Sequence, residues 1–485
     1  MQPTYLSYDR GTLLVRGEAK VPYSTWDDRV RAFRAQALYY REIVDFLRKS
    51  ELGEVKDGVE DLPPCPELRF KGKLRAYQRK ALDSWDRAGR RGVIVLPTGA
   101  GKTVIGMKAM ELVNRPAVVI VPTLDLLEQW RRRVAEDLGI EVGVYGGGEN
   151  SLKAVTIATY DSAFLRASEL GNRFSLLIAD ETHHLPAESF RQIAEMFTAP
   201  YRLGLTATYE RDDMLHLELP RLIGGVVYRL DPEDLAGRYL SDYTVERVNV
   251  ELTEGEKAEY RQNYRQFTDY LEKNRIWMRT PMDFQRFIMR TSRDPEARRA
   301  LLARNRAVKV AFDSEAKLDR LEGILRENPD ERVLVFTQHN DLVYRISKRF
   351  LLPFITHTTA KGERFEVLKG FREGRFRAVA TSKVLDEGID VPEASIGVIV
   401  SGTGSSREFV QRLGRLLRKS EGKGKARLIE LVSRETAETR TSSRRKRTRG
   451  RRGTRKGEPK AEEEEESAPE PVVTKGADEG ELYEE

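Results

Sequence analysis

A glycine-rich octapeptide at residues 96–103, Leu-Pro-Thr-Gly-Ala-Gly-Lys-Thr, most constrains how this chain can fold. It follows the apolar run 93–95 and precedes a helical pattern that begins at Val104. A polyphosphate needs several backbone N–H groups aimed at one point, and glycines let a chain curl closely around it. A chance glycine-rich turn is the alternative, but the flanking strand and helix favour a phosphate-binding loop. The loop residues expected to contact a nucleotide are Thr98, Gly99, Ala100, Gly101, Lys102 and Thr103.

Two carboxylates after a second apolar run fit the same chemistry. Lys102 would reach the β- and γ-phosphates of ATP, and the Thr103 hydroxyl would ligate Mg²⁺. Run 176–179 leads into Asp180 and Glu181. Because an acidic residue at a strand end can hold Mg²⁺ and its neighbour can activate water, we assign these two roles to Asp180 and Glu181 in that order.

Three polar residues, His183, Thr206 and Thr208, could connect the carboxylate pair to the end of the next predicted strand. His183 follows the acidic pair and would connect the nucleotide site to the next motif, with a solvated loop histidine as the alternative. Thr206 and Thr208 end another strand-like segment, and their hydroxyls can hydrogen-bond the carboxylate loop.

Short apolar runs alternate with amphipathic stretches through most of the chain, which is typical of parallel sheets flanked by helices. The expected strands of a first sheet are 93–95, 117–121, 154–158, 176–179 and 203–205, and those of a second sheet are 333–336, 354–356, 378–380, 396–400 and 428–432. The sequence therefore predicts an α/β protein with two similar parallel sheets. Polar loops at the strand ends should line the ligand-binding edge of each.

The flanking regions differ in texture from the two sheets. Residues 1–65 contain a strand-like segment, 12–16, and then a helical pattern running from Val30 to Leu47, so we expect a small α/β domain. Residues 241–310 are charged and helical with interleaved aromatic residues. They form either a basic, aromatic surface for a nucleic acid strand or a helical pair that uses the aromatics as its own core.

Composition excludes several classes of protein. The 485-residue chain has a formal charge of +7 and one cysteine, Cys65, which excludes a disulfide framework or a cysteine-rich metal centre. It has neither a membrane-length apolar run nor a signal-peptide pattern, so we expect a cytoplasmic, nucleoid-associated protein. Residues 436–485 hold a basic and then an acidic block with few large apolar side chains, and we expect them to be disordered.

Two further positions suit a nucleotide site. Gln78 precedes the phosphate loop, and its amide can both donate to and accept from an adenine edge. Gln411, Arg415 and Arg418 share one helical face at spacings of four and three. The guanidinium groups of Arg415 and Arg418 could stabilise charge on a γ-phosphate, whereas a solvated basic face is the alternative.

Taken in order, these motifs resemble those of superfamily-two helicases over residues 70–435, and within that superfamily the short form of the xeroderma pigmentosum group B (XPB) helicases. The resemblance is carried by residues 180–184, 204–208, 381–392 and 411–418. It implies two RecA-like motor lobes at 66–240 and 311–435, a damage-recognition-like domain at 1–65, and a thumb-like insertion at 241–310. It also adds Arg75 and Asp390 to the nucleotide-binding residues.

The resemblance further implies how nucleic acid is handled. Thr123, Thr159 and Thr381 should face the nucleic acid backbone. Arg211, Asp212 and Asp213 stand where the family has an Arg-Glu-Asp element, and the shorter Asp reduces the reach of its middle carboxylate. A monomeric motor with 3′ to 5′ polarity, a role in nucleotide excision repair or transcription, and a companion nuclease follow from the family alone.

Three hypotheses for function stay open at this point. The first is an ATP-dependent DNA helicase that separates strands. The second is a duplex-DNA translocase or clamp that serves as a platform for a partner nuclease without processive unwinding. The third is an RNA helicase, which a basic aromatic insertion does not exclude.

Overall fold

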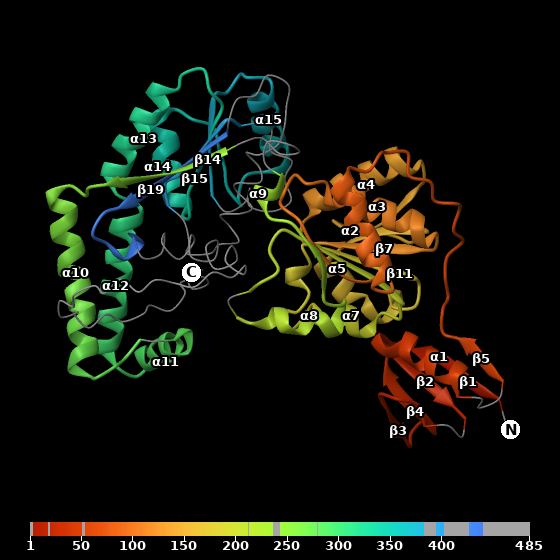
Figure 1. The fold of residues 1–485 in the computed structure, drawn as a ribbon. Helices are drawn as coiled ribbons and strands as arrows, with labels where there is room; N and C mark the ends of the chain where they lie inside the picture. Colours follow the sequence, from red (N-terminus) through yellow and green to blue (C-terminus); the bar gives the residue numbers. More distant parts are fainter. Residues whose placement is uncertain are drawn as a thin grey trace, which may run out of the picture. The chain divides into compact units, whose positions relative to one another are not determined.

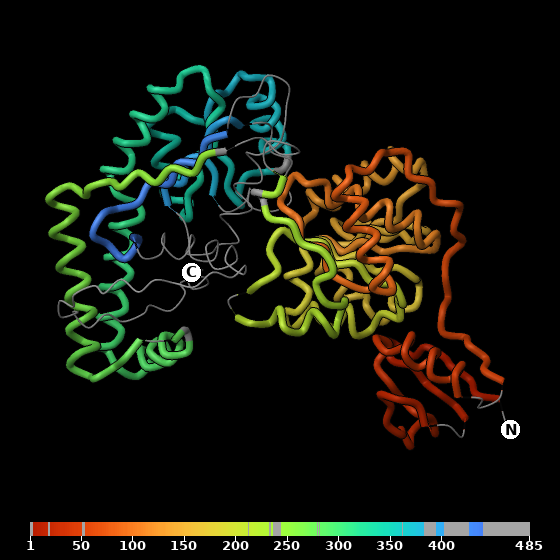
Figure 2. The backbone as a smooth tube through the Cα atoms, in the orientation of Figure 1, coloured from red at the N-terminus to blue at the C-terminus, as the bar shows by residue number. Residues whose placement is uncertain are grey.

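The computed structural model describes residues 3–17, 20–50, 54–211, 213–235, 243–278, 280–382, 394–401 and 426–439. The chain divides into two compact units, one formed by the described residues up to Leu235 and one by those from Tyr243 onward. Figures 1 and 2 trace both units. Each unit is built around its own parallel sheet.

The first unit begins with a small domain whose sheet has the strand order β3-β4-β2-β1-β5. Its elements are β1 (Thr4–Asp9), β2 (Thr12–Arg16), β3 (Ser24–Asp27), β4 (Ala32–Gln36), α1 (Tyr40–Lys49) and β5 (Val55–Gly58). Leu13 and Val15 of β2 pack with Ile43 and Leu47 of α1 in its core. The strand expected at 12–16 is confirmed.

The helix expected from Val30 is wrong in its first half. Phe33 lies on β4 and pairs with Val15 of β2, so the chain is extended there and becomes α-helical only at Tyr40. Spacings of three and four residues imitate a helix in this segment, but antiparallel pairing with β2 on one side and β3 on the other satisfies the backbone of β4 as a strand.

The second part of the first unit is an eight-stranded sheet with the order β13-β6-β12-β11-β7-β10-β8-β9. Its strands are β6 (Arg91–Val95), β7 (Ala117–Val121), β8 (Val142–Gly146), β9 (Glu149–Ser151), β10 (Val155–Thr159), β11 (Leu176–Asp180), β12 (Tyr201–Thr206) and β13 (Val226–Arg229). All neighbouring pairs are parallel except β8 with β9. The carboxyl ends of β6, β7, β10, β11 and β12 therefore meet at one edge.

Helices accompany this sheet as the sequence predicts. They are α2 (Ala76–Arg87), α3 (Lys102–Val113), α4 (Leu124–Leu138), α5 (Tyr160–Leu165), α6 (Ala167–Leu170), α7 (Arg191–Met196), α8 (Leu219–Leu222) and α9 (Pro232–Leu235). Strands β6, β7, β10 and β11 contribute fully buried side chains to a core that α5, α6 and α7 complete.

The small domain contacts the helices and loops beside this sheet through hydrogen bonds to backbone carbonyls. The Tyr8 hydroxyl donates to the Met196 carbonyl at 3.1 Å, and burial raises the pKa of Tyr8 to about 12. Asn172 Nδ2 donates to the Val59 carbonyl at 2.9 Å. A Cβ on Gly171 would lie 2.1 Å from the Tyr8 hydroxyl, so only glycine fits beside this contact.

The second unit has a six-stranded, wholly parallel sheet with the order β14-β19-β18-β15-β17-β16. Its strands are β14 (Tyr243–Val250), β15 (Val333–Phe336), β16 (Phe354–Ile355), β17 (Ala378–Thr381), β18 (Ile396–Ile399) and β19 (Ala426–Ser433), and its helices include α13 (Glu315–Glu327), α14 (Asn340–Phe350) and α15 (Lys361–Arg372). The prediction of an α/β protein with two parallel sheets is confirmed.

One expected boundary moves. Residues 241–250 were assigned to the insertion, but β14 pairs with β19 along its whole length and thus belongs to the second sheet. Because Glu246 and Arg247 are charged, the sequence of this strand resembles that of the charged insertion that follows it. The helical insertion starts only after Val250.

The insertion consists of α10 (Glu254–Lys273), α11 (Pro281–Thr291) and α12 (Pro295–Phe312), with α10 and α12 packed side by side (Figure 1). Phe267 and Tyr270 are buried in a core against which Phe284 packs, and Tyr260 is buried in a second cluster with alanines of α12. The alternative in which the aromatics form the insertion's own core is therefore correct for these four. Trp277, another aromatic residue of the insertion, is 54% exposed.

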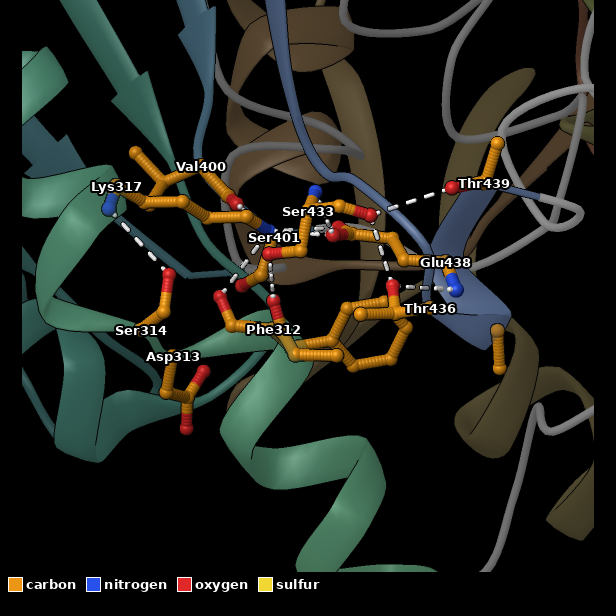
Figure 3. A network of polar contacts seen from close by, with 12 residues as sticks. Phe312, Asp313, Ser314, Lys317, Val400, Ser401, Ser433, Thr436, Glu438 and Thr439 are labelled. Atoms are coloured by element: carbon orange, nitrogen blue, oxygen red, sulfur yellow. Dashed lines mark hydrogen bonds and ion pairs between the residues drawn. The ribbon is translucent and has the colours of Figure 1, made fainter. Parts of the chain in front are cut away.

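The chain after β19 contradicts the expectation that disorder begins at residue 436. Thr436 and Glu438 are buried, and the Lys317 ammonium of α13 lies 2.6 Å from Glu438 Oε2 (Figure 3). Lys317 also donates to the Val400 carbonyl at 2.9 Å, and Ser433 N donates to Glu438 Oε2 at 2.9 Å. Each of these bonds helps to offset the desolvation of a buried charge. The rest of the expected tail, from residue 440, lies outside the described residues.

Breaking the buried pair should destabilise the second unit. Glu438→Ala leaves the Lys317 charge buried, which typically costs about 3–5 kcal/mol, measurable by urea denaturation of the full chain. The matched control is Glu251→Ala, because Glu251 pairs with Arg434 at 3.1 Å on the surface and such pairs contribute less than about 1 kcal/mol. Equal losses in the two variants would contradict the assignment.

Candidate nucleotide site

The phosphate loop connects β6 to α3 and has the backbone shape that its glycines allow. Gly99 and Gly101 have φ angles of +84° and +77°, in the left-handed region that other residues avoid. A Cβ on Gly101 would lie 2.5 Å from Gln78 Nε2. Both glycines are therefore required by conformation, and Gly101 also by close packing.

Gln78 holds the loop rather than projecting from it. Its Nε2 donates to the Ala100 carbonyl at 3.0 Å, and its Oε1 accepts from the Arg75 backbone N–H at 2.8 Å. The Tyr77 hydroxyl donates to the same carbonyl at 2.7 Å. Gln78 and Tyr77 are buried, so α2 is locked to the loop. Sequence reasoning missed Tyr77, although it directly precedes Gln78.

The acidic pair lies at the end of β11, within reach of the loop lysine. Lys102 Nζ lies 3.1 Å from Glu181 Oε1, and both side chains are about one-tenth exposed. Glu181 has a φ of +45°, a strained conformation for a residue with a side chain. The structure thus brings Lys102 next to Asp180 and Glu181, although Lys102 and Glu181 are 79 residues apart in the sequence.

Asp180 is held on both carboxylate oxygens. Trp130 Nε1 donates to Oδ2 at 2.8 Å, and the Glu181 backbone N–H donates to Oδ1 at 3.0 Å. The Tyr160 hydroxyl donates to the Asp180 carbonyl at 3.1 Å. Burial, helped by the Glu181 charge, raises the pKa of Asp180 to about 6. Sequence reasoning missed Trp130 and Tyr160, because large aromatic side chains at helical spacing look like ordinary core residues.

His183 connects this pair to the end of β12. It is fully buried, which contradicts the alternative of a solvated loop histidine. Its Nδ1 lies 2.9 Å from Thr206 Oγ1, and that hydroxyl lies 3.3 Å from Glu181 Oε2. Thr206 Oγ1 also accepts from the Thr208 backbone N–H at 3.0 Å.

Arg211 continues the same network toward the loop after β12. Its Nη1 donates to the His183 carbonyl at 2.7 Å, and its guanidinium pairs with Asp213 at 2.5 Å. Asp212, the middle residue of the expected Arg-Glu-Asp-like element, lies outside the described residues. The two flanking residues therefore bind each other, and Arg211 also binds His183.

The donor set at this edge fits a magnesium nucleotide. Asp180 and Thr103 offer a carboxylate and a hydroxyl, the hard oxygen ligands that Mg²⁺ prefers. The buried Thr98 hydroxyl, within the loop, has no hydrogen-bond partner among the described residues. A buried polar atom of this kind is satisfied when a phosphate or water joins the loop.

Two of the three threonines expected to face nucleic acid, Thr123 and Thr159, serve as helix N-caps. Thr123 begins α4 and accepts from the Leu126 backbone N–H at 3.3 Å. Thr159 begins α5 and accepts from the Ser162 backbone N–H at 3.2 Å. In the second unit, Thr381 ends β17 and donates to the Ser382 carbonyl at 3.0 Å. These bonds explain the threonines structurally and leave their nucleic acid role a prediction.

Four residues predicted to act on the nucleotide have no described position. Asp390, Gln411, Arg415 and Arg418 lie outside the described residues, so their roles stay predictions.

A strand, a Gly-Lys-Thr loop and an Asp-Glu pair on one parallel sheet, in a chain with a second parallel sheet, define a nucleotide-dependent motor of the helicase class. Comparison with known proteins narrows this class. The DNA 3′-5′ translocase XPB2 of Sulfurisphaera tokodaii is 43% identical over 442 residues, which cover 91% of this chain and 99% of that protein. The chain belongs to the XPB family of helicases.

Further comparisons agree with this family. Residues 6–59 match the xeroderma pigmentosum group B helicase damage recognition domain, 71–211 match the res subunit of type III restriction enzymes, and 313–453 match the ERCC3/RAD25/XPB C-terminal helicase. The DNA 3′-5′ helicase XPB of Mycobacterium tuberculosis is 30% identical over 77% of this chain and 63% of that protein.

A solved structure supports the fold. The Hef helicase domain of Pyrococcus furiosus matches with a TM-score of 0.51 at 18% identity, covering 78% of this chain and 98% of that one. Among the described helices, none has the length and apolar character needed to cross a membrane.

The raised pKa of Asp180 predicts an unusual pH dependence of stability. Asp180 keeps its proton in the folded protein up to about pH 6 but loses it near pH 4 when unfolded. Stability from this group is therefore greatest below pH 4 and falls as the pH rises to about 6. Relative to Asp180→Asn, the nucleotide-free protein should lose about 2–3 kcal/mol between pH 4 and pH 7, measured by thermal unfolding.

Asp213→Asn provides the control for that measurement. The Arg211 guanidinium lowers the pKa of Asp213, so this carboxylate is ionised in the folded and unfolded protein throughout most of that range. Its difference from the unsubstituted protein should stay nearly flat. A flat difference for Asp180→Asn as well would contradict the burial argument.

Proposed function

We propose that this protein is an ATP-dependent DNA translocase or helicase that moves with 3′ to 5′ polarity. The observation that carries the proposal is the cluster of Lys102, Glu181 and Asp180 at the carboxyl edge of the first sheet. The DNA substrate and the polarity are taken from the printed names of its family members.

ATP would bind on the loop between β6 and α3. Backbone N–H groups of residues 98–103 would surround the phosphates, where the Thr98 hydroxyl needs a partner. Thr103 and Asp180 would hold Mg²⁺, which when bound neutralises the phosphate charge. The Gln78 amide is bonded to the Ala100 carbonyl and to the Arg75 backbone N–H, both near the loop. Gln78 would therefore contact adenine with the one N–H and the one lone pair that these bonds leave available.

Hydrolysis would depend on an exchange of partners by Lys102. In the structure Lys102 neutralises Glu181 at 3.1 Å. A γ-phosphate competes for the same ammonium group, and its arrival would release the Glu181 carboxylate to orient and deprotonate water. The ion pair thus keeps Glu181 occupied until a nucleotide is bound.

Motion would be passed on through the hydroxyl network beside Glu181. Thr206 hydrogen-bonds both Glu181 and His183, and Arg211 donates to the His183 carbonyl. A shift of Glu181 would therefore displace the loop after β12. We assign Thr123, Thr159 and Thr381 to the nucleic acid backbone, and Thr208 and Asp213 to this coupling loop. Asp390, Gln411, Arg415 and Arg418 keep their predicted role at the nucleotide.

Two narrower roles extend the proposal. The domain at residues 6–59 resembles the damage recognition module of the family, which favours DNA repair, and nucleotide excision repair in particular. Family members named as subunits of a general transcription and DNA repair factor support opening of DNA in transcription as a second role. A companion nuclease, for which the chain would act as a platform, is part of the alternative without processive unwinding.

Removing either partner of the ion pair should abolish turnover. Lys102→Ala loses the phosphate contact, whereas Glu181→Gln should still bind ATP but lose hydrolysis by about a hundredfold or more. Phosphate release and binding of a fluorescent nucleotide separate the two effects. Lys108→Ala is the control, since Lys108 is on the same helix but pairs with Glu111 at 2.6 Å. Normal hydrolysis by Lys102→Ala or Glu181→Gln would overturn the site.

The choice among substrates needs a second experiment. ATP turnover should be stimulated by DNA more than by RNA, and a forked duplex with a 3′ tail should be unwound in preference to one with a 5′ tail. Stimulation by duplex DNA without unwinding would favour the translocase or clamp. Stimulation by RNA alone would contradict the proposal.

A further inference from the structure

Two helices that begin at the predicted DNA-facing threonines both reach Asp180. Helix α4 starts after Thr123 and carries Trp130, whereas α5 starts after Thr159 and carries Tyr160 as its first residue. Trp130 bonds the carboxylate of Asp180, and Tyr160 bonds its backbone carbonyl. The residue proposed to hold Mg²⁺ is thus hydrogen-bonded at its side chain by α4 and at its backbone by α5.

The Trp130 contact is built into the packing of the unit. The indole is fully buried, and its Nε1 lies 2.8 Å from Asp180 Oδ2. A Cβ on Gly106 of α3 would lie 2.6 Å from the Trp130 ring, so a glycine there makes room for the indole. Trp130 therefore touches the helix that follows the phosphate loop as well as the metal-site carboxylate.

The Tyr160 contact acts on the backbone of the same residue. Tyr160 is buried, its hydroxyl lies 3.1 Å from the Asp180 carbonyl, and its ring packs against Phe190 and His184 with centroids 5.1 and 5.8 Å away. Tyr160 directly follows Thr159, which is both the last residue of β10 and the N-cap of α5. A displacement of α5 would be transmitted to β11 at Asp180.

We propose that Trp130 and Tyr160 are positioning residues that hold Asp180 toward Mg²⁺ and connect it to the starts of α4 and α5. An indole N–H on one carboxylate oxygen leaves fewer orientations for the other, which favours a single metal-binding geometry. Contact of DNA with Thr123 and Thr159 would then alter the affinity for a magnesium nucleotide through these two bonds. This inference rests on the proposed function.

Conservative substitutions with matched controls isolate the two bonds. Trp130→Phe and Tyr160→Phe remove one N–H or O–H each and keep an aromatic ring. Trp85→Phe is the control for the first, because the fully buried Trp85 donates to the Arg202 carbonyl at 2.9 Å. Tyr8→Phe is the control for the second, because Tyr8 donates to the Met196 carbonyl.

The experiment is titration calorimetry of a non-hydrolysable ATP analogue on the full chain, with and without Mg²⁺ and single-stranded DNA. Trp130→Phe should weaken magnesium-dependent binding about tenfold, as loss of a hydrogen bond to a charged group does, and leave binding in chelator unchanged. Both test variants should reduce the factor by which DNA changes nucleotide affinity, while DNA binding itself is retained. Trp85→Phe and Tyr8→Phe should change neither quantity.

The outcomes separate the inference from the proposed function. Test variants that behave like their controls would overturn the positioning roles even if the unsubstituted protein is a DNA-dependent ATPase. An unsubstituted protein whose nucleotide affinity ignores DNA would overturn the link to α4 and α5, while the magnesium dependence of Trp130→Phe still decides the hold on Asp180. The proposed function is tested separately, by the stimulation of ATP turnover by DNA. If Trp130→Phe does not fold, as judged by circular dichroism, Tyr160→Phe decides through the DNA effect.

Discussion

The ion pair between Lys102 and Glu181 joins the two sequence motifs on which the nucleotide site depends. Its partners come from the loop after β6 and from the end of β11, which are not adjacent strands, because β12 lies between them in the sheet. Parallel order places both carboxyl ends at one edge and brings the charges within 3.1 Å. Everything else in the site supports or surrounds this pair.

Burial also affects the charge balance of the two carboxylates at the end of β11. Asp180 and Glu181 are neighbouring carboxylates with little solvent access, and desolvation and the Glu181 charge both raise the pKa of Asp180. Lys102 partly offsets this by its positive charge, and Trp130 does so by a hydrogen bond. A magnesium nucleotide would supply positive charge at Asp180 and take Lys102 from Glu181. Without a ligand, the negative charge of the two carboxylates is therefore only partly compensated. This favours binding of a magnesium nucleotide.

Local patterns made much of this predictable, and distant contacts did not. The phosphate loop and the strand that leads into Asp180 follow from short-range periodicity and glycine placement, and the structure has them where expected. Nothing in the spacing of Trp130 or Tyr160 marks them as partners of Asp180. Such partners become visible only when the strands are assembled in order.

The same reasoning explains the errors in the fold. Phe33 fits a helical repeat, yet β4 is fixed by pairing with neighbours on both sides. Glu438 follows the last strand in a polar segment that resembles a tail, but its carboxylate satisfies the buried Lys317 ammonium. Each case depends on a partner distant in sequence, 121 residues away for Lys317 and Glu438.

The central claim is that Lys102 exchanges Glu181 for a phosphate when ATP binds. A crystal structure of the full chain with Mg²⁺ and a non-hydrolysable ATP analogue tests it most directly. We expect Lys102 Nζ within hydrogen-bond distance of a β- or γ-phosphate oxygen, Glu181 no longer in contact with it, and Trp130 still bonded to Asp180. A bound nucleotide with the Lys102–Glu181 pair intact would contradict the account.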